Sequence, residues 1–355
     1  MYKLNEKLVN MKPYDPITEN YKIRLDANES YKNLPDFMIK RIQELIGKME
    51  FNRYPDPYAT ELCKGFARYY NVDPALVTAG NGSDELISII TGSFLSSGEK
   101  MIVISPDFSM YQFYGALSEN DIIEIKKGDD LKVDVDEVIR TAKENDVRLI
   151  CFSNPCNPTS LGVPREEVIR LVESVDSLII LDEAYMDFWR KDQSLLDVVD
   201  KYDNLFILRT CSKALGLAAV RIGFAVGNKT LTDVLRAVKS PYNMNTVAQI
   251  IGTALFEYPQ HLDQSTQEII DSRVSLESML RQMNQETHLF EHIYESNNNF
   301  VMIKTDLAND IFEALKKRSI AIRNFGRFLR ITAGYEEENR AVVEALREVA
   351  GELKK

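Results

Sequence analysis

Short, continuous runs of apolar residues recur through the middle of the chain. They are rich in β-branched side chains and do not alternate between apolar and polar positions, which is typical of strands buried on both faces. Amphipathic stretches of helical period separate several of them, such as residues 163–175 with Pro164 near the start. This alternation predicts an α/β domain with a largely parallel sheet flanked by helices. The runs expected to form strands are residues 101–104, 148–152, 177–181, 205–208 and 222–226.

The pattern changes after about residue 240. Polar-amphipathic helical stretches dominate from about residue 247 to 285, and a last helix is expected from about residue 336. Between them come apolar runs at 299–304 and 328–331, with a helical stretch at 309–318. We therefore expect a smaller α+β domain at residues 246–355, a large domain at 36–245 and an arm at 1–35, where prolines disfavour long helices.

Polar residues that could bind a ligand or take part in catalysis follow the second, third and fourth of the predicted strands. They are Asn154 and Asn157, then Asp182, then Lys213. Ligands of parallel α/β sheets bind beyond the carboxyl ends of the strands, so we expect these side chains to meet at one edge. A lysine there, among small and apolar neighbours, loses hydration and has a lowered pKa, which suits Schiff-base chemistry with a carbonyl cofactor. For Lys213 alone, a solvated surface lysine is the alternative.

Three local motifs favour an anionic cofactor with a protonatable ring. Residues 80–85 (Gly-Asn-Gly-Ser-Asp-Glu) precede a helical run, and glycines there let backbone N–H groups approach an anion; an ordinary helix cap is the alternative. Two Asn-Pro steps at 154–158 indicate a rigid loop that aims an amide at a ligand, whereas a single step would indicate only a turn. Asp182 would either pair with a protonated ring nitrogen in a dry site or cap a helix.

Composition argues against several other classes of protein. The net charge of −11 leaves no basic stripe for a nucleic acid, and no apolar run is long enough to span a bilayer. The chain starts with polar residues instead of the apolar core of a signal peptide, and its four cysteines show no C-x-x-C spacing, which fits a reducing cytoplasm. The three histidines lie away from every motif, so we expect neither a metal site nor a histidine base.

The order and spacing of these motifs resemble one enzyme family. Asn-Pro-x-Asn-Pro-Thr at 154–159, Asp-Glu-Ala-Tyr at 182–185, Ser-Lys at 212–213 and the following Arg221 are similar to the motifs of fold-type-I pyridoxal-phosphate (PLP) aminotransferases. Within that superfamily the chain resembles the histidinol-phosphate aminotransferases over nearly its whole length. The stretches that carry this closer resemblance are residues 12–14, 25–29, 52–57, 241–243 and 329–332.

The resemblance implies a complete PLP site. Lys213 would attach the cofactor and shuttle protons, and Asp182 would keep the pyridine nitrogen protonated. Asn157 and Tyr185 would hydrogen-bond the ring hydroxyl, and Phe108 would stack on the ring. The groups implied to hold the phosphate are Gly82, Ser83, Asp84, Thr210, Ser212, Arg221 and, in a homodimer with shared sites, Tyr54 of the partner subunit.

The resemblance also implies the substrates. Arg330 would bind the α-carboxylate of glutamate, and Asn157, Arg323 and Tyr14 would help to hold histidinol phosphate, in a transamination with 2-oxoglutarate that belongs to histidine biosynthesis. Residues 30–33 (Ser-Tyr-Lys-Asn) depart from the Asn-Pro-Tyr-Gly of the family. An aromatic amino-acid aminotransferase and a threonine-phosphate decarboxylase on the same fold therefore remain alternatives. A cofactor-binding regulator would need a DNA-binding module, for which the sequence offers no basic region.

Overall fold

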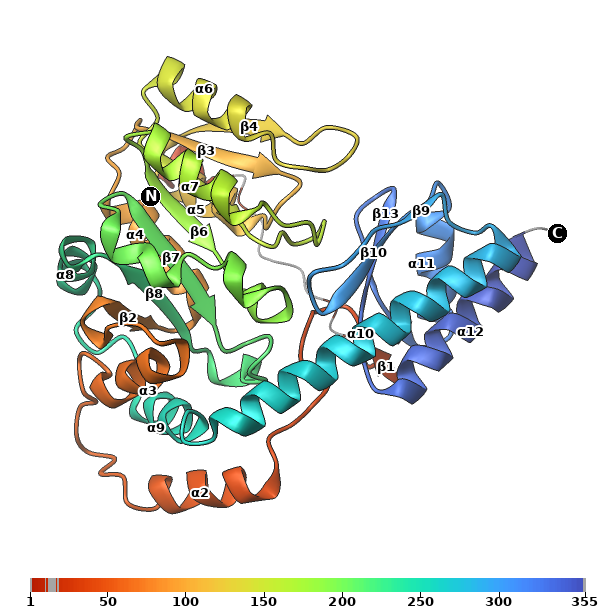
Figure 1. The fold of residues 1–355 in the computed structure, drawn as a ribbon, viewed down its shortest axis with the longest axis horizontal. Helices are drawn as coiled ribbons and strands as arrows, with labels where there is room; N and C mark the ends of the chain where they lie inside the picture. The colour runs from red at the N-terminus through yellow and green to blue at the C-terminus, as the bar shows by residue number, and fades with distance from the viewer. Residues whose placement is uncertain (1, 10, 12–16, 18, 354–355) are drawn as a thin grey trace.

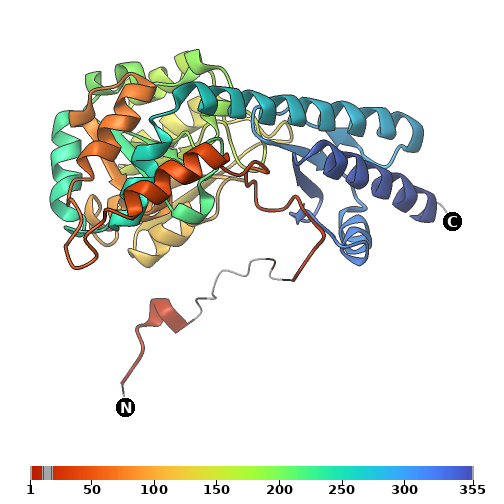
Figure 2. The same cartoon turned by 90° about the horizontal axis from the view of Figure 1, so that it is seen from below.

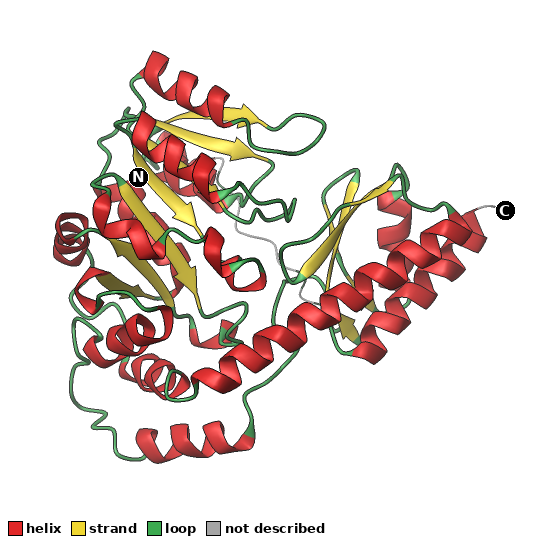
Figure 3. Ribbon diagram, viewed as in Figure 1, coloured by secondary structure: helices red, strands yellow, loops and turns green. Residues whose placement is uncertain are grey.

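The structure is a computed structural model that describes residues 2–9, 11, 17 and 19–353. The chain forms a larger α/β unit and a smaller α+β unit, and the long helix α10 (Pro259–Thr287) runs from one to the other (Figure 1). Helices cover both faces of the larger sheet (Figure 3). Every helix in the described part of the chain is too short or too polar to cross a membrane.

The larger sheet confirms the predicted architecture. In the described residues it has seven strands in the order β2-β8-β7-β6-β5-β3-β4. Neighbours from β7 through to β4 are parallel, whereas β8 pairs antiparallel with both β7 and β2. The five predicted runs form β3, β5, β6, β7 and β8. The strands are β2 (Val77–Gly80), β3 (Lys100–Ser105), β4 (Asp121–Lys126), β5 (Leu149–Ser153), β6 (Leu178–Asp182), β7 (Leu205–Thr210) and β8 (Gly223–Gly227).

Most helices of the larger unit bury apolar side chains on one face, against this sheet or a neighbouring helix. In α7, Val168, Leu171 and Val172 are buried at helical spacing, and the helix begins after Pro164 because the fixed φ of proline suits a helix start. This helix confirms the stretch predicted at 163–175. The helices are α2 (Asp36–Ile46), α3 (Thr60–Tyr70), α4 (Gly82–Ser93), α5 (Met110–Leu117), α6 (Val135–Asn145), α7 (Arg165–Ser174) and α8 (Lys229–Val238).

The smaller unit contains an antiparallel sheet with strand order β12-β13-β10-β9. On β13, Leu329 and Ile331 enter a core shared with α10, α11 and α12, so the alternating residue Arg330 lies on the opposite face of the sheet. That face is turned toward the larger unit, since Met302 of β10 packs with Leu131. The elements are β9 (His292–Ile293), β10 (Phe300–Lys304), α11 (Ala308–Lys317), β12 (Arg323–Asn324), β13 (Phe328–Thr332) and α12 (Glu336–Leu353).

Two segments near the predicted domain boundaries pack with a unit other than the domain in which the prediction placed them. In the N-terminal arm, which contains the short helix α1 (Glu6–Val9), β1 (Ile23–Arg24) pairs in parallel with β11 (Ile320–Ala321), so this strand belongs to the smaller unit. Helix α9 (Thr246–Leu255) packs against α2 and α3 of the larger unit, although it follows the predicted boundary. In the smaller unit α10 and α12 lie side by side (Figure 2). The boundary at residue 246 stays a prediction.

Candidate active site

A cavity of about 550 Å³ lies at the carboxyl ends of β5, β6 and β7, where the two units meet. Parallel strands bring their carboxyl ends to the same edge, which is why motifs far apart in the sequence share one wall. The smaller unit contributes residues of β12 and β13, and the arm contributes Ile17, Arg24 and residues 26–29. The predicted site residues that line the cavity are Ser83, Asp84, Phe108, Asn157, Asp182, Tyr185, Thr210, Ser212, Lys213, Arg221, Arg323 and Arg330.

Asp182 is the last residue of β6 and is buried in the wall of this cavity. Its carboxylate accepts hydrogen bonds from the Tyr111 hydroxyl (2.8 Å) and the Ala184 backbone N–H (3.0 Å), both neutral donors. Burial raises the pKa of Asp182 to about 7, although these hydrogen bonds oppose the rise. A buried carboxylate without a cation in direct contact is costly, so this position favours a positively charged ligand group.

Lys213 follows β7 and reaches into the same cavity from the loop beyond the strand. Its Nζ donates a hydrogen bond to the Ala27 carbonyl (3.1 Å) and lies 5.9 Å from the centre of the Tyr185 ring. Burial, and then the positive charge of Arg330, lower the pKa of Lys213 to about 8. The lowered pKa agrees with the sequence-based expectation. A larger share of this amine is therefore neutral, and so nucleophilic, near physiological pH than for an ordinary lysine.

Tyr185 is held in place by Asn28 from the arm. The Asn28 side-chain amide donates to the Tyr185 hydroxyl (2.8 Å), and Thr332 holds Asn28 by exchanging two hydrogen bonds with it (3.0 and 3.1 Å). Asn28 has a φ of +55°, a conformation that asparagine tolerates better than most residues. Burial raises the pKa of Tyr185 to about 12, so its hydroxyl stays protonated and can donate to a ligand.

A corner of the cavity gathers donors that suit an anion. The N-terminus of α4 begins at Gly82, whose φ is +80°, and a Cβ there would lie 2.8 Å from Arg221 Nη2. Glycine therefore lets the helix start approach the guanidinium closely. Arg221 also contacts Asp84 (3.4 Å) and the Ser212 hydroxyl (3.3 Å), and the Thr210 hydroxyl accepts from the Ser212 N–H (3.1 Å). Helix N–H groups, hydroxyls and a guanidinium together form a typical phosphate site.

Two arginines of the smaller unit form the other side of the cavity. Arg330 Nη1 donates to Asn157 Oδ1 (2.5 Å), and its Nη2 donates to the Asp26 carbonyl (2.7 Å). Arg323 is its direct neighbour in the β12–β13 pair, so both side chains lie on the same face of the hairpin. Arg330 also lies over the Phe325 ring, with 5.4 Å between Cζ and the ring centre. Two guanidinium groups at one wall favour carboxylate or phosphate ligands.

The sequence profile described as aminotransferase class I and II matches residues 20–346. The chain belongs to this family. It is 38% identical to the histidinol-phosphate aminotransferase of Clostridium novyi (strain NT), over 95% of this chain and 94% of that relative. It is 35% identical to the histidinol-phosphate aminotransferase of Clostridium kluyveri (strain NBRC 12016), over 97% of both chains.

The fold of this aminotransferase is shared with solved structures. The crystal structure of histidinol-phosphate aminotransferase from Sinorhizobium meliloti in complex with pyridoxal-5'-phosphate superposes on it with a TM-score of 0.89, at 21% identity and with 99% of each chain covered. The predicted resemblance and the predicted fold class are therefore confirmed. At that level of identity the superposition describes the fold, and the roles of individual residues rest on the geometry of the cavity.

Several residues that line the aminotransferase cavity were not predicted from the sequence, and Tyr111 and Asp107 are two of them. Tyr111 holds the carboxylate of Asp182, and its ring meets that of Phe108 at 82° with centres 5.5 Å apart. Asp107 is bonded to Ser153, accepting from its hydroxyl and from its N–H (3.1 Å), at the start of the loop that carries the Asn-Pro steps. The only local signal was their nearness to Phe108 in the sequence. Both Asn-Pro bonds of that loop are cis.

Two predicted site residues that the structure describes, Gly82 and Tyr54, do not line the cavity. Gly82 lies against the Arg221 guanidinium, since a Cβ at this position would come within 2.8 Å of Arg221 Nη2. Tyr54 is 80% exposed and stacks on Tyr242 with ring centres 4.5 Å apart, so its contribution from a partner subunit stays a prediction. Tyr14 lies outside the described residues.

The donor set of the aminotransferase cavity fits PLP. The cofactor has a ring nitrogen that can carry a positive charge, and Asp182 offers a buried carboxylate whose hydrogen-bond donors are neutral. It also has an aldehyde, for which Lys213 offers an amine of lowered pKa. Its phosphate matches the corner formed by the start of α4 and Arg221. All three groups line one cavity.

Proposed function

We propose that this protein is a PLP-dependent aminotransferase that transfers an amino group between histidinol phosphate and 2-oxoglutarate in histidine biosynthesis. The observation that carries the proposal is one cavity that combines Asp182, Lys213 and Arg221 with the arginine pair of the smaller unit, Arg323 and Arg330. The names of relatives that are similar over nearly the whole chain support the choice of substrate.

Different residues of the cavity would bind different parts of the cofactor. PLP, when bound, supplies an electron-withdrawing ring that stabilises negative charge at the substrate Cα. Asp182 would balance the charge of the ring nitrogen, Tyr185 and Asn157 would hydrogen-bond the ring hydroxyl, and Phe108 would pack on the ring. The groups that would hold the phosphate are the N-terminal N–H groups of α4 at Gly82, Ser83 and Asp84, the hydroxyls of Thr210 and Ser212, and Arg221.

Lys213 would do both covalent and acid–base work. Its Nζ would attach the cofactor covalently, and as a free amine it would take the proton from the substrate Cα. A pKa of about 8 suits this role, because a general base works best when its pKa is close to the working pH. The hydroxyl of Tyr185, which stays protonated because its pKa is about 12, remains a hydrogen-bond donor throughout.

The arginine pair would hold both substrates in turn. The planar fork of Arg330 suits the α-carboxylate of glutamate, and its contacts to Asn157 and Asp26 fix its orientation before a ligand arrives. Arg323, its cross-strand neighbour, would add a second positive charge for the phosphate of histidinol phosphate, together with Tyr14. One cationic wall can serve both half-reactions because the two substrates bind at different times.

We also propose that the enzyme works as a cytoplasmic homodimer. Tyr54, Phe51, Tyr58 and Tyr242 are large aromatic side chains on the surface of the described chain, and exposed apolar groups of this kind favour a subunit contact. Tyr54 of the partner subunit would then reach the phosphate of the cofactor. All four cysteines are free and buried, which supports a reducing compartment.

Chemical trapping tests the cofactor assignment. Borohydride reduction of the purified yellow holoenzyme, followed by peptide mapping, should place the cofactor on Lys213. Lys239 is an internal control, since burial also lowers its pKa but it does not line the cavity and should stay unlabelled. Lys213→Ala should still bind PLP non-covalently, by equilibrium dialysis, and should lose activity by several orders of magnitude. A label on another residue, or none, overturns the assignment.

A substrate panel tests the reaction. Histidinol phosphate, phenylalanine and threonine phosphate are compared side by side through the loss of the visible absorbance of the bound cofactor. The proposal requires the fastest reaction with histidinol phosphate. A faster reaction with phenylalanine would identify an aromatic aminotransferase, and release of CO₂ from threonine phosphate would identify a decarboxylase.

A further inference from the structure

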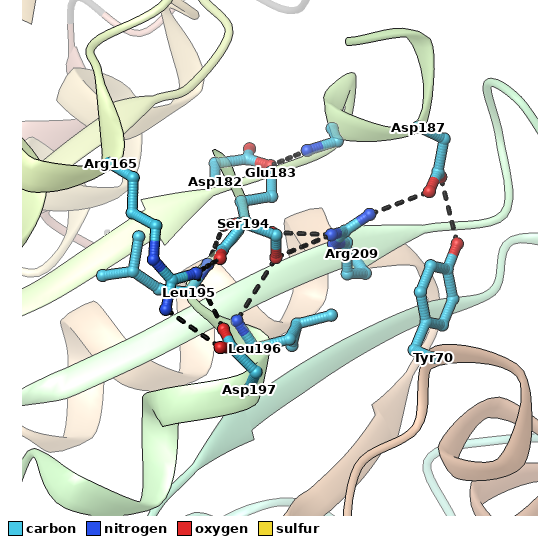
Figure 4. Close-up of polar contacts among 11 residues, drawn as sticks. Tyr70, Arg165, Asp182, Glu183, Asp187, Ser194, Leu195, Leu196, Asp197 and Arg209 are labelled. Atoms are coloured by element: carbon cyan, nitrogen blue, oxygen red, sulfur yellow. Dashed lines mark hydrogen bonds and ion pairs between the residues drawn. The ribbon is translucent and has the colours of Figure 1, made fainter. Parts of the chain in front are cut away.

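A cluster of buried charges lies directly behind the carboxyl ends of β6 and β7. It contains Glu183 and Arg209, which are 0% and 4% exposed, together with the less buried Asp187 (Figure 4). Neither Glu183 nor Arg209 is among the residues that line the active-site cavity. The family resemblance assigned no role to either residue.

Both carboxylate oxygens of Glu183 have partners within this cluster. Its carboxylate contacts Arg209 Nη2 (2.7 Å) and accepts from the Ser194 hydroxyl (2.7 Å) and the Leu195 N–H (3.1 Å). Figure 4 shows these groups pointing toward one another, with Glu183 and Ser194 on one side of the guanidinium and Asp187 on the other. The cluster is therefore a connected network of charged and neutral groups.

Arg209 is the centre of the network. Its Nη1 pairs with Asp187 (2.9 Å), which also accepts from the Tyr70 hydroxyl (3.0 Å), and its Cζ lies 4.9 Å from the centre of the Tyr70 ring. Its Nη2 also donates to the Ser194 hydroxyl (3.0 Å). Burial alone would lower the pKa of Arg209, but the carboxylates of Glu183 and Asp187 raise it, so the guanidinium stays charged. A buried charge that loses its partner is strongly destabilising. Movements that would separate Arg209 from Glu183 are therefore costly, and the pair holds the two side chains in one arrangement.

The network joins the two strand ends that carry the catalytic groups. Asp182 is paired with Leu208 in the parallel β6–β7 register, and the next N–H, that of Glu183, donates to the Leu208 carbonyl (3.0 Å). Because side chains alternate along a strand, Glu183 and Arg209 project from the face of the sheet opposite to Asp182. Glu183 directly follows Asp182, the last residue of β6. Arg209 directly precedes Thr210, the last residue of β7, and the loop with Ser212 and Lys213 comes next.

We propose that the Glu183–Arg209 ion pair is a positioning element that fixes Asp182 relative to Lys213, so that carboxylate and amine meet the cofactor in the reactive alignment. The inference rests on the proposed PLP-dependent function. Both residues act through their neighbours, since neither reaches the cavity. Displacement of a reacting group by about 1 Å from a change away from the chemistry can lower a rate by about a hundredfold, which sets the scale of the effect.

Glu183→Gln tests the proposal, because glutamine keeps the shape of the side chain and removes the charge. The variant should bind PLP, and its kcat should fall about tenfold to hundredfold, with KM for glutamate within about twofold of the parent. The visible circular dichroism of the bound cofactor should change in shape or sign, since it reports the setting of the ring. Arg209→Lys, which keeps the charge but cannot reach Glu183 and Asp187 together, should give a smaller change in the same direction.

Glu277→Gln is the matched control. Glu277 pairs with Arg273 (3.4 Å) on α10, where both side chains are largely buried and remote from the cavity. This variant should lower the melting temperature without changing kcat or the dichroism. If Glu183→Gln behaves like this control, with parental kcat and dichroism, the cluster is purely structural and the proposal is overturned.

A second variant keeps the test decisive where Glu183→Gln does not fold. Ser194→Ala removes one neutral hydroxyl that contacts both members of the pair and leaves all charges in place. It should lower kcat and alter the dichroism to a smaller extent, and unchanged values would overturn the proposal. A parent enzyme without bound PLP, or without a label on Lys213, would instead refute the proposed function, so the two failures are distinct.

Discussion

Replacing Asp182 by asparagine should stabilise the cofactor-free protein and lower its affinity for PLP. Burial raises the pKa of Asp182 from its ordinary 3.8 to about 7 in the folded protein. The folded state therefore binds the proton more tightly than the unfolded state, so ionisation of this group destabilises the fold as the pH rises from about 4 to about 7. Below pH 3.8 the group is protonated in both states and the penalty is absent.

The size of the effect follows from this pKa difference. At about 1.36 kcal/mol per pH unit, the step from 3.8 to about 7 amounts to roughly 4 kcal/mol at pH 8 and roughly 2 kcal/mol at pH 5.5. The stability gained by Asp182→Asn in the absence of cofactor should therefore grow by roughly 2 kcal/mol between those pH values. The nearby carboxylates of Asp107 and Asp84 repel the charge of Asp182 and so help to raise its pKa. Asp182→Asn removes this repulsion, which adds to the gain in stability.

The assay is urea unfolding of cofactor-free parent and variant at pH 5.5 and pH 8, with PLP affinity measured in parallel. Any loss of packing or of the Tyr111 hydrogen bond is the same at both pH values, so the change with pH isolates the charge. Asp121→Asn, at an exposed residue of β4, controls for the substitution itself. A stability difference between Asp182→Asn and the parent that is constant with pH, or that shrinks toward pH 8, would refute the reasoning. So would unchanged affinity for PLP.

Two further predictions concern the substrates and the subunits. Arg330→Ala should impair both half-reactions by about 2–5 kcal/mol, roughly thirty- to several-thousand-fold, whereas Arg323→Ala should impair the histidinol-phosphate half-reaction more than the glutamate one. Single-turnover rates of each half-reaction test this, with Arg327→Ala, at an exposed arginine, as the control. Equal effects of Arg323→Ala on both substrates would contradict its role. Tyr54→Phe should weaken PLP binding about tenfold to hundredfold. Hybrid dimers of Tyr54→Phe and Lys213→Ala chains should recover one site of parental affinity, and no recovery would exclude shared sites.

The sequence could predict the elements whose signal is local. Strands buried on both faces, such as β5 and β6, stand out as continuous apolar runs, and an amphipathic helix such as α7 shows its period within one segment. Strand β4 was not predicted, because it is an edge strand with a single buried residue, and Glu124 interrupts its apolar run. The antiparallel direction of β8 was not predicted either, since an apolar run indicates burial but not direction.

The sequence by itself determined which functional groups meet at the site. Asp182 and Lys213 each come at the end of a buried strand, and a parallel sheet brings the ends of such strands together. Only the tertiary structure decided how these groups are supported. Arg330 reaches Asn157 across 173 positions, and Asn28 reaches Tyr185 across 157. The raised pKa of Asp182 and the lowered pKa of Lys213 likewise come from burial beneath neighbours distant in sequence. Motifs record which functional groups a segment carries, whereas hydrogen bonds, burial and charge depend on distances that exist only once the chain is folded.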